Sequence, residues 1–314
     1  MQIFRDTTHF PVLPYVVLSS GSFDGIHLGH QQILKRLVQI AKENKGQSVI
    51  ITFFPHPRLF FGQEVSLLNT LEEKIILLDK IGIDYLLILP FDKELANYTA
   101  EEFIQKIYIE TTHTKKLVIG YDHHFGKGRE GNFTFLAKNI TQYPFQIEEI
   151  PAKDIDNIAI SSTKIRKALL SGDTKTACLY LGRPYSLKGK VIQGDKLGRK
   201  LGFPTANLEI AEAYKLIPKE GVYAVEVFWK TNKYEGMLHI GRRPTLQKQN
   251  DLRIEVHLLN FEQEIYDEYL ELHFIDFIRE NIKFENLEQL TQQLAEDKII
   301  CIKQLETYKN SNKK

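Results

Sequence analysis

The chain has 314 residues, of which 43% are hydrophobic and 26% charged. This composition is ordinary for a globular protein, and at about 150 residues per domain the length predicts two domains. Lysine and arginine number 41 against 40 aspartates and glutamates, so the formal charge is +1 and no basic excess favours binding to nucleic acid.

Location in the cell is predicted from what the sequence lacks. The longest apolar stretches, such as Tyr85–Phe91, are too short to span a membrane. Residues 1–20 have no signal-peptide cleavage pattern. Cys178 and Cys301 are far apart, which argues against a disulfide framework. We therefore expect a cytoplasmic protein with no membrane partner.

Strand-like and helix-like segments alternate through residues 11–183. Apolar residues recur at helical spacing from Ile33 to Ala41, and capping-box pairs of threonine and glutamate at 70/73 and 99/102 predict two further helix starts. The expected strands are Pro14–Ser19, Val49–Phe54, Tyr85–Leu89, Lys116–Ile119 and Phe145–Ile150. This alternation predicts an α/β domain whose parallel sheet carries helices on both faces.

The pattern changes near residue 183. Short strand-like runs follow without helices between them, and residues 285–308 return to helical spacing. The expected strands are Tyr185–Gln193, Gly221–Trp229, Lys233–Gly241, Leu252–Asn260 and Glu264–Phe274. We expect a small antiparallel barrel with one or two closing helices, and hence domains 1–183 and 184–314.

Two glycines and two histidines coincide where the first strand passes into the first helix. The start of a helix favours an anion, and Gly21 and Gly25 let the backbone turn tightly there. His27 and His30 are three residues apart, so both can project from one face of the opening turn. The pattern predicts a phosphate site.

Other interpretations of these glycines and histidines stay open. The stretch can be a tight turn with two solvated histidines, or a zinc site that lacks an obvious third ligand. Residues Gly126–Gly131 also match a dinucleotide-binding pattern, but they lie beyond their strand and lead into no clear apolar helix. We interpret them as a loop over the site.

The second half contains its own glycine-rich stretch. Gly194, Gly198 and Gly202 recur every four residues with lysine and arginine between them, as in a loop that cradles phosphate. Thr205 and Asn207 follow as oxygen donors suited to Mg²⁺. The alternative is a basic surface loop that leads into a strand.

Glu255 lies in the strand-like run that follows these motifs. Ile254, Val256 and Leu258 alternate around it, which places Glu255 on the opposite face from those side chains. That parity suits a catalytic residue if the barrel is lined by a ligand pocket, and not if the barrel is filled. The alternative is an exposed strand carboxylate.

Taken in order, these motifs resemble those of bacterial bifunctional riboflavin kinase/FAD synthetases. The blocks are Gly-x-Phe-Asp-Gly-x-His-x-Gly-His at 21–30, Phe-Phe-Pro-His-Pro at 53–57, Gly-Tyr-Asp-His-His-Phe-Gly at 120–126, Ser-Ser-Thr-Lys-Ile-Arg at 161–166, the glycine-rich loop ending in Pro-Thr-Ala-Asn at 204–207, and the strand around Glu255. The ordered set covers nearly the whole chain. The resemblance implies a Rossmann-like nucleotidyltransferase domain followed by a riboflavin kinase barrel with a closing helix.

The resemblance also implies the residues of the adenylyltransferase site. The ATP-binding residues would be Gly21, Ser22, Phe23, His27, His30, Asp122, Ser162, Thr163 and Arg166, and the flavin-binding residues Pro55, His56, Pro57 and Phe125. His27, His30 and Arg166 would be the catalytic members. The attacking phosphate oxygen of FMN is already ionised, so donors and positive charge around the triphosphate matter more than a base.

For the kinase, the attacking group is a hydroxyl that must lose a proton, so a positioned acceptor helps. The resemblance implies Glu255 as that acceptor, with Asn207 as a second catalytic residue. The implied ATP-binding residues are Gly194, Lys196, Gly198, Gly202, Thr205 and Asn207, of which Thr205 and Asn207 would also bind Mg²⁺. ATP is the expected co-substrate of both steps, with riboflavin, FMN and FAD as substrates and products.

Some residues depart from the family pattern. His123 and His124 replace an aromatic and a basic residue, His239 replaces asparagine, and Asp267 replaces a glycine, where it is expected to disturb the turn. Three alternatives to two activities are a single remaining activity, a non-catalytic flavin-responsive regulator, and an adenylyltransferase for another phosphorylated substrate. The sequence leaves the oligomeric state and the choice between Mg²⁺ and Mn²⁺ open.

Overall fold

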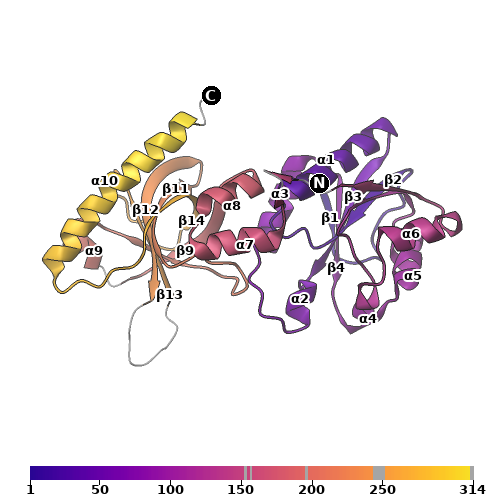
Figure 1. Ribbon diagram of the computed structural model, residues 1–314, viewed down its shortest axis with the longest axis horizontal. Coiled ribbons are helices and arrows are strands. Elements are labelled where there is room, and N and C mark those ends of the chain that lie inside the picture. Colours follow the sequence, from indigo (N-terminus) through magenta and orange to yellow (C-terminus); the bar gives the residue numbers. More distant parts are fainter. Residues whose placement is uncertain (152–153, 156–157, 195–196, 243–251, 312–314) are drawn as a thin grey trace. The chain divides into compact units, whose positions relative to one another are not determined.

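The computed structural model describes residues 1–151, 154–155, 158–194, 197–242 and 252–311. By its internal contacts the chain forms two compact units, Met1–Ser162 and Thr163–Lys314 (Figure 1). Within the described ranges, every helix is too short or too polar to cross a bilayer.

A six-stranded sheet forms the centre of the first unit, and all its neighbouring strands are parallel, in the order β1-β4-β3-β2-β5-β6. The strands are β1 (Gln2–Phe4), β2 (Val16–Ser20), β3 (Gln47–Phe54), β4 (Tyr85–Pro90), β5 (Thr114–Gly120) and β6 (Gln146–Ile150). The predicted parallel sheet is confirmed, with β1 as an additional edge strand. A two-stranded hairpin, β7 (Asp154–Ile155) and β8 (Ile158–Ala159), follows the sheet.

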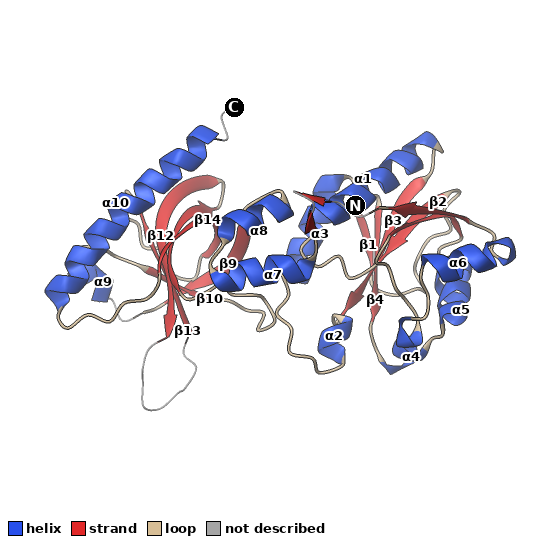
Figure 2. Cartoon of the chain, viewed as in Figure 1, coloured by secondary structure: helices blue, strands red, loops and turns tan. Residues whose placement is uncertain are grey.

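Helices cover both faces of this sheet (Figure 2). Apolar residues of α1 (Leu28–Glu43) and α3 (Leu71–Ile81) pack on one face, and those of α5 (Ala100–Phe103), the π-helix η1 (Ile104–Thr111) and α6 (Phe133–Asn139) on the other. The shorter elements are α2 (Pro57–Phe60), α4 (Lys93–Asn97), and the 3₁₀ turns η2 (Lys127–Arg129) and η3 (Ile140–Gln142). Both expected capping boxes form, at Thr70/Glu73 and Thr99/Glu102.

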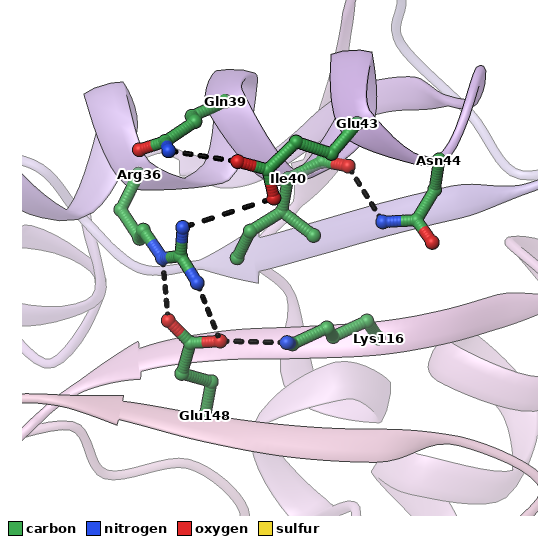
Figure 3. A network of polar contacts seen from close by, with 7 residues as sticks. All are labelled: Arg36, Gln39, Ile40, Glu43, Asn44, Lys116 and Glu148. Carbon is green, nitrogen blue, oxygen red and sulfur yellow. Dashed lines mark hydrogen bonds and ion pairs between the residues drawn. The ribbon is translucent and has the colours of Figure 1, made fainter.

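An ion-pair network holds the body of α1 on the sheet (Figure 3). Arg36 of α1 donates through Nε to Glu148 of β6 at 2.6 Å. Lys116 of the neighbouring strand β5 contacts the other oxygen of Glu148 at 2.6 Å. The hydrogen bond from Arg36 lowers the pKa of Glu148. Because α1 is fixed in this way, its N-terminal turn has a defined position at the edge of the sheet.

The second unit is a closed antiparallel barrel with the strand order β10-β13-β12-β11-β14-β9. The strands are β9 (Tyr185–Ile192), β10 (Ala206–Glu209), β11 (Gly221–Trp229), β12 (Asn232–Arg242), β13 (Leu252–Leu258) and β14 (Tyr269–Arg279). The predicted barrel is confirmed. Two details differ: β10 forms within the Pro-Thr-Ala-Asn motif, and β14 begins five residues later than expected, at Tyr269, because residues up to Glu268 form a turn.

The barrel is closed by a single long helix, α10 (Leu287–Ser311). Cys301 and Leu305 of α10 pack against apolar side chains of β11 and β12. Asp297 of α10 is fully buried and accepts hydrogen bonds from Arg279 of β14 at 2.6–3.0 Å. The short helix α9 (Leu197–Lys200) precedes β10.

Helices α7 (Ser162–Ser171) and α8 (Thr174–Leu181) precede the barrel strands. Thr174 donates its hydroxyl to the carbonyl of Ile275 in β14, and the backbone N–H of Lys219 donates to the carbonyl of Leu169. By their contacts these helices belong to the second unit, apart from Ser162. The domain assignment 1–183 and 184–314 stays a prediction.

Candidate active sites

Three of the sequence motifs follow three neighbouring strands of the parallel sheet. Residues 21–30 follow β2, residues 55–57 follow β3 and residues 121–126 follow β5. Strand β2 lies inside the sheet, with β3 paired on one side of it and β5 on the other, so the strand order changes direction at β2. Ligands of open α/β sheets bind at such a switch point, beyond the carboxyl ends of the strands. The sheet therefore brings the predicted nucleotide and flavin motifs to one edge.

The loop after β2 has an unusual backbone. Phe23, Gly25 and Ile26 all have positive φ, at 44°, 86° and 39°. A non-glycine residue is rarely stable there unless its surroundings hold it. The carboxylate of Asp24 accepts the N–H of Leu68 at 2.9 Å, and the Asp24 carbonyl accepts the Ser162 hydroxyl at 2.8 Å.

Two histidines are stacked at the start of α1. The rings of His27 and His30 are 3.7 Å apart between centroids and nearly parallel. Nδ1 of His27 accepts the His30 N–H at 3.3 Å, so His27 caps the helix. Nδ1 of His30 is buried without a hydrogen-bond partner among the described residues. Burial, together with His27 and Lys74, holds the pKa of His30 well below its usual value, so at neutral pH it offers a neutral imidazole to a ligand.

The remaining predicted residues of this site differ in exposure. Pro55 is exposed, whereas His56 is buried and caps α2 by accepting the Arg58 N–H at 3.1 Å. Phe125 is only 7% exposed and belongs to the apolar core beneath the site. Asp122 is exposed directly after β5. The ligand contacts of these residues stay predictions.

Thr163 and Arg166 lie on α7, in the second unit. Ser162 of the serine-rich block donates its hydroxyl to the Asp24 carbonyl in the loop after β2. The parts assigned to Thr163 and Arg166 in the adenylyltransferase site stay predictions.

A hydrogen-bonded group behind the loop was not predicted. The hydroxyls of Ser20 and Tyr108 are 2.6 Å apart, and Nε2 of His123 lies 3.4 Å from the Ser20 hydroxyl. Tyr108 comes from the π-helix η1, a type of helix that is frequent at functional sites. Burial lowers the pKa of His123 to about 4, so this departure from the family pattern introduces a neutral side chain. His124 instead donates to the carbonyl of Asp122.

Lys74 is a second residue that sequence reasoning missed. It lies on α3 with Leu71 and Leu78, and all three are buried. A lysine within the apolar stripe of an amphipathic helix was the available signal. Burial lowers the pKa of Lys74 to about 8.

In the barrel, three polar residues lie in register on three neighbouring strands. Asn207 of β10 is the pairing partner of Glu255 on β13, and Glu255 is the partner of His239 on β12. Directly opposed side chains on paired strands share a face, with Cβ atoms about 5 Å apart. Burial lowers the pKa of His239, while Glu255 and the hydrogen bond to Asn281 oppose that shift.

This row lies on the outer face of the barrel. His239 is the pairing partner of Val222, which packs against Cys301 and Leu305 of the external helix α10. The predicted alternation around Glu255 is confirmed, because Ile254 and Val256 are buried on the other face. Among the described residues, apolar side chains such as Leu238, Ile254 and Val256 fill the interior of the barrel. The condition that the sequence set for Glu255, a ligand pocket inside the barrel, is therefore not met, and a ligand would have to reach this residue from the outer face.

The glycine-rich loop approaches this row closely. A Cβ on Gly194 would collide with the amide of Asn207, and a Cβ on Gly198 would collide with the carbonyl of Phe203 and lie 3.5 Å from the Thr205 hydroxyl. Glycine is therefore required where the backbone passes these side chains. Gly202 turns the chain with a φ of 80°. Lys196 lies outside the described residues.

A cavity of about 420 Å³ opens beside Thr205. Arg199, Phe261 and Tyr266 contribute to its lining. Glu262 and Glu264 also line it, and Arg199 is paired with Glu264 at 2.8 Å. The aromatic rings suit a ligand with a ring system.

The turn at Asp267 forms in spite of the expected disturbance. Asp267 adopts a φ of 62°, its N–H donates to the carbonyl of Val191, and its carboxylate contacts Lys190 at 2.7 Å. The expectation was wrong because aspartate tolerates the left-handed region better than most residues.

Comparisons with known proteins agree with both halves. A family model for FAD synthetase matches residues 12–164, and one for riboflavin kinase matches residues 181–305. Proteins named bifunctional riboflavin kinase/FMN adenylyltransferase are similar: that of Listeria monocytogenes is 38% identical, with 90% of each chain covered. That of Haemophilus influenzae is 38% identical, with 91% of this chain and 93% of the relative covered, and that of Escherichia coli K12 is 35% identical over 90% of each.

Among solved structures, the crystal structure of a macrolide-efflux protein from Streptococcus pneumoniae matches with a TM-score of 0.87 and 30% identity, covering 95% of this chain and 97% of that one. Its name is not shared by the curated relatives above. The α/β unit and the barrel, each with a phosphate-handling motif, define a two-part transferase. Within that class, the chain belongs to the family of bifunctional riboflavin kinase/FMN adenylyltransferases.

Proposed function

We propose that the barrel unit phosphorylates riboflavin to FMN and that the α/β unit then transfers AMP from ATP to FMN, which yields FAD and pyrophosphate. The observation that carries the proposal is that each unit has its own cluster of groups suited to phosphate chemistry. One is the histidine pair at the start of α1, and the other is the row of Asn207, Glu255 and His239. A single-activity protein would leave one cluster without a purpose.

The two clusters differ as the two reactions differ. In adenylyl transfer the nucleophile is an ionised phosphate, so the site needs donors and positive charge. His27, His30, Ser162, Thr163 and the N-terminus of α1 would supply donors, and Arg166 would supply the positive charge. In the kinase reaction the riboflavin hydroxyl must give up a proton as the γ-phosphate transfers, and Glu255 is the acceptor in this scheme.

Mg²⁺ is part of the proposal for the kinase. Thr205 and Asn207 would hold it through side-chain oxygens, which are ligands that Mg²⁺ prefers. The fit is supported by the close approach of Gly194 to the Asn207 amide and of Gly198 to the Thr205 hydroxyl, which places the backbone of the glycine-rich loop beside both proposed ligands. When bound, the ion neutralises charge on the transferring phosphate.

The pocket beside Thr205 is where we place the nucleotide of the kinase, with Gly194, Lys196, Gly198 and Gly202 around its phosphates. A cytoplasmic location also belongs to this proposal. The two free cysteines, Cys178 and Cys301, fit a reducing compartment.

One assay tests both activities. The purified protein is incubated with riboflavin, ATP and Mg²⁺, and riboflavin, FMN and FAD are separated by chromatography over time. We expect FMN to appear first and FAD to follow. Formation of FMN alone, or of FAD only from supplied FMN, would leave one activity, and binding of flavin without turnover would support a regulator. Consumption of ATP with a different phosphorylated acceptor would point to another adenylyltransferase.

A further inference from the structure

Lys74 is a buried cation that none of the site assignments above uses. It comes from α3, its side chain is almost completely buried, and its Nζ donates to the carbonyl of Ser22 at 2.7 Å. The same Nζ lies 3.3 Å from the hydroxyl of Thr52, which is fully buried in β3. The lysine therefore connects the loop after β2 with the neighbouring strand.

Burying an amino group in this way lowers the stability of the folded protein. Removal from water disfavours the charged form of a lysine, and the pKa of Lys74 falls to about 8 for that reason, although Asp24 opposes the fall. A methionine or leucine would fill the same place in the apolar stripe of α3 without this cost. The position of Lys74 thus calls for an explanation beyond packing.

The contact with Ser22 determines how the loop presents its backbone. In a trans peptide the carbonyl of one residue and the N–H of the next point in opposite directions. Because Lys74 holds the Ser22 carbonyl, the N–H of Phe23 points away from Lys74, and it has no hydrogen-bond partner among the described residues. An N–H held in this direction is available to a phosphate oxygen.

The loop needs such support because of its backbone conformation. Phe23 and Ile26 both have positive φ, and residues in that region persist only where contacts hold them. Asp24 fixes the loop by accepting the N–H of Leu68, and Gly21 donates to the carbonyl of Ile51. Lys74 provides the contact between these two, at Ser22.

We propose that Lys74 is a positioning residue of the adenylyltransferase site, which holds the Ser22–Phe23 peptide so that its N–H faces the nucleotide phosphates. This inference rests on the proposed function of the α/β unit. Lys74 does not touch the reacting atoms and acts through the loop. Its nearness to His30 adds a second effect, since the ammonium helps to keep that imidazole neutral.

The test compares Lys74→Met with Lys80→Met in the full-length protein. Lys80 is on the same helix but exposed in its last turn, so the chemical change is matched. We expect Lys74→Met to lower kcat for FAD formation from FMN by about tenfold or more, which is a conservative figure because losing one preorganised donor costs about 10²–10³. Lys80→Met should leave it unchanged, and riboflavin phosphorylation should be unchanged in both variants.

A third variant and a stability measurement separate positioning from folding. Lys74→Gln keeps a donor for the Ser22 carbonyl without the charge, and we expect it to recover part of the lost kcat. The melting temperature of Lys74→Met should equal or exceed that of the original protein, since a buried charge is removed. The inference would be overturned if kcat for FAD formation by Lys74→Met stayed within about twofold of the original value. A tenfold change corresponds to about 1.4 kcal/mol. Equal loss in the Met and Gln variants with a lowered melting temperature would also overturn the inference. If the original protein forms no FAD from FMN, the proposed function itself fails.

Discussion

Glu255→Gln is the substitution that most directly tests the assignment of the kinase site. Glutamine keeps the volume of the side chain at the centre of the row formed with Asn207 and His239, but it cannot accept the proton of a hydroxyl. We expect the rate of FMN formation from riboflavin to fall by about 10²–10⁴-fold, the usual contribution of a positioned acid or base. Formation of FAD from supplied FMN should not change.

The structure also sets the expected effect on stability. The side chain of Glu255 is half-buried and makes no hydrogen bond or ion pair with the described residues, so the free energy of unfolding should change by less than about 1 kcal/mol. The predicted loss of rate corresponds to about 3–5 kcal/mol of barrier height. Partial unfolding is therefore too small an effect to explain the loss.

The assay measures initial rates of both reactions on the same preparation, with riboflavin or FMN as the acceptor, and products separated by chromatography. Glu209→Gln is the matched control, because Glu209 is an exposed carboxylate on the neighbouring strand β10. A loss of FMN formation smaller than about tenfold would show that Glu255 is not the proton acceptor. A parallel loss of FAD formation, with an unchanged melting temperature, would show that the two sites are not independent.

Three further outcomes are expected. His30→Ala, which removes one ring of the stacked pair, should slow FAD formation by about 10²-fold and leave FMN formation intact; unchanged FAD formation would contradict its role. Asp297→Asn breaks the buried pair with Arg279, which costs about 3–5 kcal/mol and should lower the temperature of kinase inactivation by roughly 10 °C without affecting FAD formation; an unshifted inactivation curve would refute this. Burial lowers the pKa of Lys74 from 10.5 to about 8, so between these values the unfolded chain holds a proton that the folded chain has lost, and stability rises with pH. Urea unfolding at pH 8 and pH 10.5 should show the original protein gaining up to about 3 kcal/mol relative to Lys74→Met, and a constant difference would argue against the buried charge.

Much of the α/β unit could be predicted because its signals are local. The capping boxes at Thr70 and Thr99 are set by residues three positions apart, and the glycines and histidines after β2 are adjacent in the sequence. Strand β1 was missed because it is three residues long, largely exposed and polar at its first position. Such a strand is fixed by its pairing with β4, which no local pattern reveals.

The sequence predicted which residues belong to the site in the barrel, but it did not predict how they are arranged. Asn207 and Glu255 were identified through the family motifs, but their shared register depends on how β10 and β13 pair, and that pairing is non-local. The same holds for Lys74, whose partner Ser22 lies in a different element. His123 is a further case, since its contact with Ser20 depends on the neighbouring positions of β2 and β5.

The attachment of α7 and α8 to the barrel strands affects how the protein can be divided into working halves. A fragment that stops at residue 183 would carry both helices without the rest of the unit in which Leu169 and Leu181 are buried. A fragment that starts at 184 would lose the hydrogen bond from Thr174 to Ile275. Both fragments would expose apolar surface and tend to aggregate. Division just after Ser162 keeps the internal contacts of each unit, so that is where both halves should fold independently. The α/β half made in this way would lack Thr163 and Arg166, so on the proposed assignment it should fold without forming FAD.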